Sequence, residues 1–533
     1  MDEAPWGTIP ELLDDAARRF PDADALADGA QRWTFTELRG RVHDAARALI
    51  ASGVAHGERI GIWAPNIAEW VVAALAVHNV GAVLVPVNTR FKGKEAGDVL
   101  GRSRVRRLFT VTDFLDIDYV ELIRAEGGLG LDEIVVLRGT ARPGTVSFDD
   151  FLSRGTTVDD AVRATRAGAV QPSDVCHILF TSGTTGAPKG AMLEHGQICR
   201  AYVVFADVVG LRQGDRYLIV NPFFHSFGLH AGILCCLMVG ATIIPQVVFD
   251  PSAVMHRIAD ERITAFPGPP AVYQGILNHP DANLIDLRSL RLAILGAAAV
   301  PVELIRQMRD RLGIETVVTG YGITEASGIV TMCRHDDDPE VVANTAGRPL
   351  PGLELRVVDD AGRDVAAGTP GEVLVRGYNL MRAYLDDPEQ TAAAIDAAGF
   401  LHTGDIGVIR GDGNLVITDR KKDMFIVGGF NAYPAEIENA MLRHPHVGQV
   451  AVIGVPDQRL GEVGMAFVIP RPDTAPDPDE IIRWCRSEFA NYKVPRYVRI
   501  VDRFPLNATG KVLKYELRDE GRRLVGHATG DAS

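Results

Sequence analysis

The stretch Thr181-Ser182-Gly183-Thr184-Thr185-Gly186-Ala187-Pro188-Lys189-Gly190 decides how the rest of this chain is interpreted. It follows the run His177-Ile178-Leu179-Phe180, which is typical of the end of a buried strand. Glycines let a backbone approach a phosphate closely, hydroxyl and N–H groups donate hydrogen bonds to it, and a lysine adds positive charge. The stretch is not a Walker loop, because Gly190 follows the lysine. It predicts a phosphate-binding loop after a strand; a flexible Ser/Thr/Gly loop is the alternative.

The length and composition of the chain limit the classes of protein it can be. At 533 residues it exceeds what one hydrophobic core normally organises, so we expect at least two domains. A hydrophobic share of 47% and a charged share of 23% are typical of a soluble globular protein. The net charge of −14, without a long basic run, argues against a nucleic acid or an anionic membrane as the main partner.

Three features indicate a cytoplasmic protein without an integral membrane segment. The six cysteines follow no metal-binding spacing, and Cys235 and Cys236 stand in an apolar run, as small buried residues do. The N-terminus lacks the basic and apolar regions of a signal peptide. The apolar stretch 227–249 is long enough to span a bilayer, but Gly240 and Pro245 divide it. We expect a buried helix, a turn and a strand there.

Helical and strand patterns alternate through the first part of the chain. Thr34-x-x-Glu37 resembles a capping box, and apolar residues recur at helical spacing from there to Gly53. Patterns of a strand at 59–63, a helix at 67–79 and a strand at 82–87 follow, and the alternation returns between 196 and 318. It predicts layered α/β structure with largely parallel sheets, as two paired subdomains on either side of residue 175.

The pattern changes near residue 347. Glycines separate short β-branched runs at 353–358 and 372–375, which predicts a small antiparallel β subdomain. The charged stretch 419–423 has the composition of a linker, and a final α+β pattern follows it. We therefore place an N-terminal domain at 1–420 and a small C-terminal domain at 421–533. The tail after about residue 521 is expected to be frayed.

Four further motifs follow the phosphate loop in order. They are PFFHSFG at 222–228, GYGITE at 320–325, TGD at 403–405 and NATGK at 507–511. With the loop, this set resembles the adenylate-forming superfamily in its acyl-CoA synthetase branch, and the later half is similar to actinobacterial CoA ligases of steroid- or terpenoid-derived acids. The resemblance covers roughly residues 10–520. It implies an α/β fold: a large N-terminal domain of two α/β subdomains plus a small β subdomain, then a small, mobile α+β C-terminal domain.

The resemblance implies a reaction in two steps and a set of site residues. A carboxylic acid attacks the α-phosphate of ATP, giving acyl-AMP and pyrophosphate, and coenzyme A then forms the thioester and releases AMP. The implied catalytic residues are Lys511, Glu325 and His225. The implied ATP- and AMP-binding residues are Thr181, Ser182, Gly183, Thr184, Thr185, Gly186, Lys189, Gly296, Ala297, Ala298, Tyr321, Gly322, Thr324, Asp405, Arg420 and Lys511. Mg²⁺ would bind to Glu325 and Thr184.

Several of these implied roles have a physical reason, and each residue also has an interpretation without a function. Lys511 would offset the repulsion between phosphate and carboxylate; an ordinary exposed lysine is the alternative. Asp405 would accept both ribose hydroxyls, with Arg420 as a second ribose contact, and without the motif order it would be a loop residue. Tyr321 would lie against the adenine, where a core tyrosine is the alternative. For Glu325 the alternative is a carboxylate at a helix start.

The second step would use the same site after a rotation of the C-terminal domain. The resemblance implies a hinge at Lys422 and a pantetheine tunnel for coenzyme A along Gly428 and Gly429, which would otherwise form an ordinary turn. His225 would be the gate between the acyl and thiol sites; a satisfied core histidine is the alternative.

Two positions in the sequence limit the class of acid that we expect as the substrate. Amino-acid-activating relatives carry aspartate where this chain has Ser226, and acetate-specific relatives carry tryptophan where it has Gly322. We therefore expect a bulky polycyclic or a medium-to-long-chain carboxylic acid. The residues expected around it are His225, Phe227, Ala298, Gly322 and Ile323.

Two other functions stay open at this point. One is an adenylating enzyme that loads a carrier protein, although no carrier sequence is attached to this chain. The other is a nucleotide sensor without catalysis, which the presence of Lys511, Glu325 and Asp405 disfavours. A homodimer is compatible with all of these functions.

Overall fold

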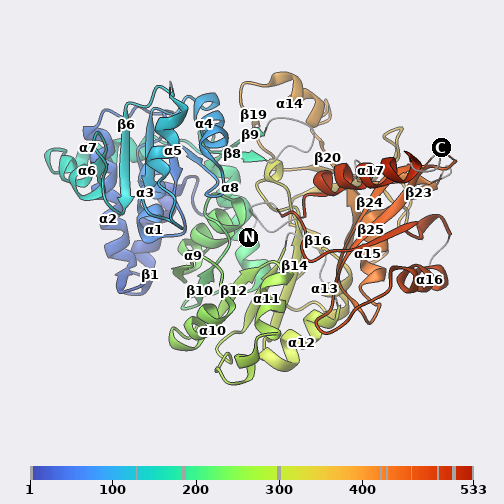
Figure 1. Cartoon of the computed structure of the whole chain (residues 1–533). Coiled ribbons are helices and arrows are strands. Elements are labelled where there is room, and N and C mark those ends of the chain that lie inside the picture. The colour runs from blue at the N-terminus through green and yellow to red at the C-terminus, as the bar shows by residue number, and fades with distance from the viewer. Residues whose placement is uncertain are drawn as a thin grey trace.

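The computed structural model describes residues 4–127, 129–181, 188–296, 302–420, 423–427, 430–457, 459–488, 491–506 and 512–530. Two large sheets, a small antiparallel sheet and a C-terminal sheet organise the chain. In Figure 1 the first sheet and the C-terminal elements lie at opposite ends of the molecule. The expected α/β class with a smaller α+β C-terminal part is confirmed.

The first large sheet has eight strands in the order β19-β9-β8-β4-β3-β5-β6-β7. They are β3 (Arg59–Trp63), β4 (Val83–Pro86), β5 (Arg107–Val111), β6 (Glu133–Arg138), β7 (Val146–Ser147), β8 (Val175–Thr181), β9 (Lys189–Glu194) and β19 (Ala383–Tyr384). The helices of this region are α2 (Phe35–Ala51), α3 (Ala68–Asn79), α4 (Gly93–Arg102), α5 (Tyr119–Glu126), α6 (Phe148–Arg154), η1 (Gly155–Thr157) and α7 (Asp160–Gly168). All strand pairs are parallel except the two made by β9, which is antiparallel to both β8 and β19.

The second large sheet has nine strands in the order β16-β15-β14-β13-β12-β10-β11-β1-β2. They are β1 (Asp24–Asp28), β2 (Gln31–Thr34), β10 (Arg216–Ile219), β11 (Thr242–Pro245), β12 (Ala265–Gly268), β13 (Leu292–Leu295), β14 (Thr316–Tyr321), β15 (Thr331–Met332) and β16 (Arg348–Pro349). Its helices are α1 (Ile9–Arg19), α8 (His195–Val209), the π-helix η2 (Phe227–Leu234), α9 (Cys235–Val239), α10 (Pro251–Asp260), α11 (Pro270–Leu277), η3 (Pro280–Asn283), α12 (Val302–Leu312), η4 (Thr324–Ala326) and α13 (Pro339–Asn344).

The two smaller sheets follow. The antiparallel sheet consists of β17 (Glu354–Val358), β18 (Gly371–Arg376), β20 (Leu401–Ile409) and β21 (Leu415–Arg420), with α14 (Pro388–Ala394) before β20. The C-terminal part contains β22 (Phe425–Val427), β23 (Phe430–Ala432), α15 (Pro434–Met441), β24 (Val447–Asp457), β25 (Gly461–Pro470), α16 (Pro478–Glu488), η5 (Asn491–Lys493), β26 (Tyr497–Ile500) and α17 (Lys514–Gly530). The expected small β subdomain is therefore confirmed.

Local sequence signals account for several elements. Thr34 caps α2, and its hydroxyl accepts a hydrogen bond from the Glu37 N–H while the Glu37 carboxylate accepts one from the Thr34 N–H, as the capping box predicts. The stretch 227–249 forms η2, α9, a left-handed Gly240 and then β11, as expected. Among the helices in the described ranges, none combines the length and apolar composition needed to cross a bilayer.

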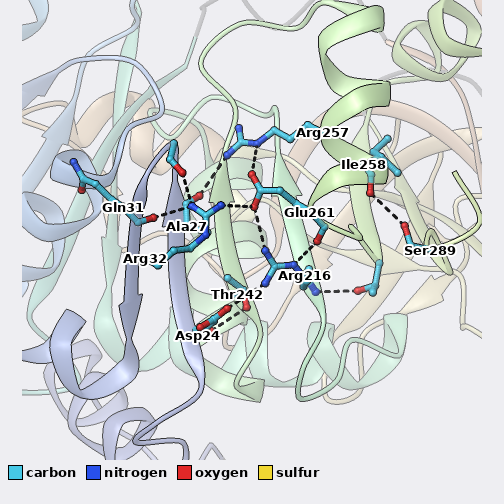
Figure 2. A network of polar contacts seen from close by, with 12 residues as sticks. Asp24, Ala27, Gln31, Arg32, Arg216, Thr242, Arg257, Ile258, Glu261 and Ser289 are labelled. Carbon is cyan, nitrogen blue, oxygen red and sulfur yellow. Dashed lines mark hydrogen bonds and ion pairs between the residues drawn. The ribbon is translucent and has the colours of Figure 1, made fainter. Parts of the chain in front are cut away.

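The expected division of the two α/β subdomains at residue 175 is wrong in detail. The β1–β2 hairpin, near the N-terminus, joins the second sheet, where β1 runs parallel to β11. Glu261 follows α10 and pairs with Arg32 of β2 at 3.3 Å, Arg216 of β10 at 3.1 Å and Arg257 of α10 at 3.0 Å (Figure 2). This partly exposed charge network joins the hairpin to the second sheet, a contact that chain order does not reveal.

The expectation of a frayed tail after residue 521 is also wrong, because α17 continues to Gly530. Leu517 is buried in the C-terminal core, and a β-carbon at Gly521 would lie 2.8 Å from Ile453 Cδ1 of β24. This core is separate from the one shared by the two large sheets. The domain boundary at 420/421 stays a prediction, and Lys422, the predicted hinge, lies outside the described residues.

Candidate active site

The predicted phosphate loop connects two antiparallel strands of the first sheet. β8 ends at Thr181 and β9 begins at Lys189, and these two residues are register partners. The Thr181 hydroxyl donates a hydrogen bond to the Lys189 carbonyl at 3.4 Å. Ser182, Gly183, Thr184, Thr185 and Gly186 lie outside the described residues. The strand before the loop is confirmed, and phosphate binding stays a prediction.

The Lys189 side chain is directed toward a segment far along the chain. Its Nζ donates to Gln390 Oε1 at 2.5 Å and lies 5.0 Å from the centre of the Tyr384 ring. The pairing of β19 with β9 places Tyr384 opposite Ala191. Sequence reasoning missed Tyr384 and Gln390, because the stretch 384–390 has the composition of an ordinary turn and helix start.

Glu325 is presented by the short helix η4. Its carboxylate accepts a hydrogen bond from the Tyr384 hydroxyl at 2.8 Å, and its carbonyl accepts one from the Met381 N–H at 2.7 Å. Burial, followed by the charge of Glu325, raises the pKa of Tyr384 and keeps its hydroxyl protonated as a donor. A single carboxylate suits Mg²⁺, which takes one or two carboxylates together with phosphates and water. Glu325 therefore fits the predicted metal role, whereas Thr184 lies outside the described residues.

Ser327 fixes the far end of the turn that carries Glu325. It is fully buried and has a left-handed backbone, with φ of 59°. Its hydroxyl donates to the Asn379 carbonyl at 2.7 Å, and its own carbonyl accepts a hydrogen bond from Tyr202 at 2.8 Å. Helix α8 and the segment around residue 379 therefore both hold the turn in place.

Four buried histidines form a row that leads away from Ser327. His230 Nδ1 lies 3.3 Å from the Ser327 carbonyl oxygen, and its Nε2 lies 3.3 Å from His177 Nδ1. The ring of His78 is centred 4.7 Å from that of His177 and 5.7 Å from that of His195. Burial lowers the pKa of all four, to about 3 for His195 and His230. The row is therefore neutral near pH 7.

The predicted adenine and ribose residues come together in the structure. Tyr321 ends β14, and its hydroxyl donates to Asp405 Oδ2 at 2.5 Å. Asp405 stands in the middle of β20 with 3% of its surface exposed. It is the register partner of Arg420, whose side chain lies outside the described residues. The structure thus places Tyr321 beside Asp405, and nucleotide binding by them stays a prediction.

The predicted acyl gate stands at the start of η2. The Phe227 N–H donates to His225 Nδ1 at 3.2 Å, and burial lowers the pKa of His225 to about 4. The imidazole of His225 is therefore neutral near pH 7, and its role as a gate stays a prediction. A β-carbon at Gly296 would lie 3.4 Å from Phe227 Cε1, so the ring covers a residue predicted to border the adenine. Ala297 and Ala298 lie outside the described residues.

Gly322 meets a requirement of the backbone. A β-carbon there would lie 2.1 Å from the carbonyl oxygen of Gly328, so no side chain fits without moving that loop. This close approach of two backbone segments gives one reason for the glycine, and the expectation that it also makes room for a large acyl group stays a prediction. Thr324 begins η4, and Ile323 packs against the apolar cluster of the small sheet. Their substrate and nucleotide contacts stay predictions.

The C-terminal residues predicted for catalysis and for the coenzyme A path fall in short gaps between described segments. β22 ends at Val427 and β23 begins at Phe430, its register partner, and Gly428 and Gly429 lie outside the described residues. Lys511 also lies outside them; Leu506 and Val512, on either side of its motif, form an antiparallel bridge.

Comparisons with known proteins cover nearly the whole chain. Residues 13–385 match the family described as AMP-binding enzyme, and residues 436–511 match the AMP-binding enzyme C-terminal domain. A 3-[(3aS,4S,7aS)-7a-methyl-1,5-dioxo-octahydro-1H-inden-4-yl]propanoyl:CoA ligase from Mycobacterium tuberculosis is 50% identical over 514 residues, covering 96% of this chain and 99% of the relative. The ligase of the same name from Rhodococcus jostii is 48% identical over 526 residues, covering 98% and 100%.

A solved structure shows the same architecture. The crystal structure of an anthranilate CoA ligase in complex with anthranoyl-AMP has a TM-score of 0.88 to this chain at 29% identity. The likeness covers 97% of this chain and 98% of that one. The match therefore includes both the large N-terminal part and the C-terminal part.

Proposed function

The chain belongs to the family of AMP-binding enzymes and is an acyl-CoA ligase, and on that premise we propose that its substrate is a bulky polycyclic propanoic acid. The family reaction joins the acid to AMP at the expense of ATP and then transfers the acyl group to coenzyme A. The single observation that carries the proposal is about 50% identity, along almost the entire chain, to two ligases named for a bicyclic, steroid-like propanoyl group.

We further propose a role for each of the described residues in the first step, the formation of acyl-AMP. Lys189 offers its ammonium to the β- and γ-phosphates, and Glu325 holds Mg²⁺, which would neutralise phosphate charge when bound. Asp405 accepts hydrogen bonds from the ribose hydroxyls, and the Tyr321 ring lies against the base. What supports this division is that each of the two carboxylates is already oriented by a tyrosine hydroxyl, at 2.5 Å for Asp405 and 2.8 Å for Glu325.

The remaining roles rest on the resemblance of the motifs. Lys511 is proposed to counter the charge at the α-phosphate during adenylation. Gly428 and Gly429 are proposed to line the coenzyme A path after a rotation about Lys422. His225, neutral because burial lowers its pKa to about 4, separates the acyl and thiol sites without attracting the negative charge of the acid.

The experiment that tests the substrate is a comparison of acids under one assay. The purified chain receives ATP, Mg²⁺, coenzyme A and, in separate reactions, the bicyclic dione propanoic acid, dodecanoic acid or acetate. We expect coenzyme A-dependent AMP release with kcat/KM at least about 10-fold higher for the bicyclic acid, because even one methylene of misfit in an apolar pocket costs about 1–3 kcal/mol. An equal or higher value for dodecanoic acid would overturn the proposal.

A further inference from the structure

One short segment of the chain touches both the candidate phosphate lysine and the candidate metal carboxylate. The Tyr384 hydroxyl donates to Glu325 at 2.8 Å, while the face of the same ring lies 5.0 Å from Lys189 Nζ. The tyrosine is 7% exposed, so neither contact is made at the open surface. Lys189 and Glu325 are 136 positions apart in the sequence, and Tyr384 brings them into one arrangement.

The segment itself is held firmly. The Tyr384 N–H donates to the Thr391 hydroxyl at 2.9 Å, and that hydroxyl donates to the Asp387 carbonyl at 2.8 Å. The Asp387 carboxylate caps α14 by accepting from the Gln390 N–H at 3.0 Å. Gln390 is thereby placed to accept the Lys189 ammonium at 2.5 Å. The tyrosine and the glutamine therefore act from one rigid turn.

We propose that Tyr384 is a positioning residue. It keeps the side chains of Lys189 and Glu325 from pairing with each other and holds each in its own orientation. A lysine and a glutamate this close to one ring would otherwise gain by forming an ion pair and neutralising each other. In the described part of the chain they form none: the phenol oxygen binds the carboxylate, while the ring face and Gln390 bind the ammonium. The inference rests on the proposed roles of the two charged residues.

The arrangement leaves each charged group with a neutral partner that a ligand can replace or share. A neutral amide and an aromatic face bind an ammonium more weakly than a carboxylate does. The phosphates of a bound triphosphate can therefore replace them as partners of the Lys189 ammonium. The phenol donor fixes the direction of the Glu325 carboxylate before a cation arrives. Such prior orientation of binding groups lowers the cost of assembling the site.

Two substitutions separate the hydroxyl from the ring. Tyr384→Phe removes the donor to Glu325 and keeps the ring under Lys189, whereas Tyr384→Leu removes both. The matched control is Tyr378→Phe, since Tyr378 also lies under a cation, with Arg200 at 4.1 Å, and donates a hydrogen bond to the Pro351 carbonyl at 3.2 Å. Calorimetry then measures ATP binding without Mg²⁺, followed by Mg²⁺ binding to the ATP-loaded protein.

We expect Tyr384→Phe to leave magnesium-free ATP binding within about twofold and to weaken Mg²⁺ binding about 10-fold, as loss of a hydrogen bond to a charged group does. Tyr384→Leu should also weaken magnesium-free ATP binding, because Lys189 is then free to pair with Glu325. Tyr378→Phe should change neither. In a Glu325→Ala background, Tyr384→Phe should have no further effect on Mg²⁺ binding.

The inference is overturned if Tyr384→Phe equals the unsubstituted chain in both titrations, or if it weakens both equally. An effect of Tyr384→Phe that persists in full in the Glu325→Ala background also overturns it. These results differ from a failure of the proposed function, in which the unsubstituted chain itself makes no adenylate. Circular dichroism melting of each variant identifies any loss caused by unfolding, and the phenylalanine variant, which keeps the buried ring, decides the case if the leucine variant does not fold.

Discussion

The candidate site contains two carboxylates, and each accepts a hydrogen bond from a tyrosine, yet the two are built differently. Asp405 stands in the middle of the nine-residue strand β20 and is the register partner of Arg420 in β21, whereas the register with β18 shifts between His402 and Ile406. Glu325 stands on η4, a single turn of three residues. Tyr321 reaches Asp405 from the end of β14, a strand of the second large sheet, whereas Tyr384 reaches Glu325 from a segment 59 positions later.

This difference indicates which contacts orient each of the two carboxylates. Pairing with β21 fixes the backbone of Asp405, so the direction of its side chain depends less on any one side-chain neighbour. A three-residue turn has little structure of its own, and Glu325 depends on contacts from Met381, Ser327 and Tyr384. We therefore expect the ribose side of the site to tolerate loss of its tyrosine and the metal side to be sensitive to it.

The largest effect is expected at the rigid carboxylate itself. Asp405→Ala should lower kcat/KM for ATP in adenylate formation by at least about 100-fold, since two charge-assisted hydrogen bonds to ribose are worth roughly 1.5–3 kcal/mol each. Pyrophosphate exchange measures this, and Asp405→Asn, which keeps the shape, should lose less. A loss below about fivefold for Asp405→Ala, in a folded variant, would contradict the ribose role.

The second effect concerns the carboxylate on the turn. Glu325→Gln should raise the Mg²⁺ concentration needed for half-maximal pyrophosphate exchange by about 10- to 100-fold, because the amide keeps the shape but loses the charge that binds the cation. Binding of AMP without Mg²⁺ should stay within about twofold, in contrast to Asp405→Asn, which should weaken it. If both variants weaken AMP binding equally, the two sides of the site are not separate.

The ribose side of the site was the more predictable from sequence. Asp405 and Tyr321 lie in short motifs at the ends or middle of β-rich runs, and the motif order alone predicted that they serve one nucleotide; the structure joins them at 2.5 Å. The alternation of helices and strands likewise predicted the parallel sheets, since period and capping signals are local. The fold class followed from the same local signals.

The contacts around Glu325 and Lys189, and the place of the β1–β2 hairpin, were less predictable because they join segments that are far apart in the sequence. Tyr384 and Gln390 sit in an ordinary helix start, and nothing in the residue pattern relates them to Lys189 on β9. The β1–β2 hairpin joins the second sheet through the pairing of β1 with β11 and the contact of Arg32 with Glu261, each across more than 200 positions. One reason for Gly322 is a backbone approach by Gly328, which only the folded chain displays.

The third effect concerns the buried histidines next to the turn that carries Glu325, and it is measured as the pH dependence of the stability of the fold. His230 contacts Ser327, and His177, His78 and His195 continue the row, all with pKa values lowered by burial. The unfolded chain binds protons below about pH 6.5 while the folded row does not, so stability is complete above that pH and falls as the pH decreases toward 3.

At pH 5 each buried histidine should cost up to about 2 kcal/mol of unfolding free energy relative to pH 7. Urea unfolding at the two pH values measures the difference. The variant His78→Leu should reduce the pH dependence, because a leucine fills a fully buried position with an apolar side chain that does not titrate. The exposed His256, changed to Gln, is the control and should leave the dependence unchanged. A stability independent of pH between 7 and 5 would contradict the neutral row.

The smallest effect is expected from Tyr321→Phe, and it decides whether the two carboxylates differ as described. The substitution keeps the ring that is proposed to lie against the adenine and removes the hydrogen bond to Asp405. Since pairing with β21 holds the Asp405 backbone, we expect AMP binding to weaken by only about two- to fivefold, within the range of a single ordinary hydrogen bond. Tyr384→Phe should weaken Mg²⁺ binding more, because the turn that carries Glu325 has no such strand partners. Calorimetry with AMP and with Mg²⁺–ATP places both variants on one scale, and a Tyr321→Phe loss equal to or larger than that of Tyr384→Phe would show that strand register does not by itself orient the ribose carboxylate.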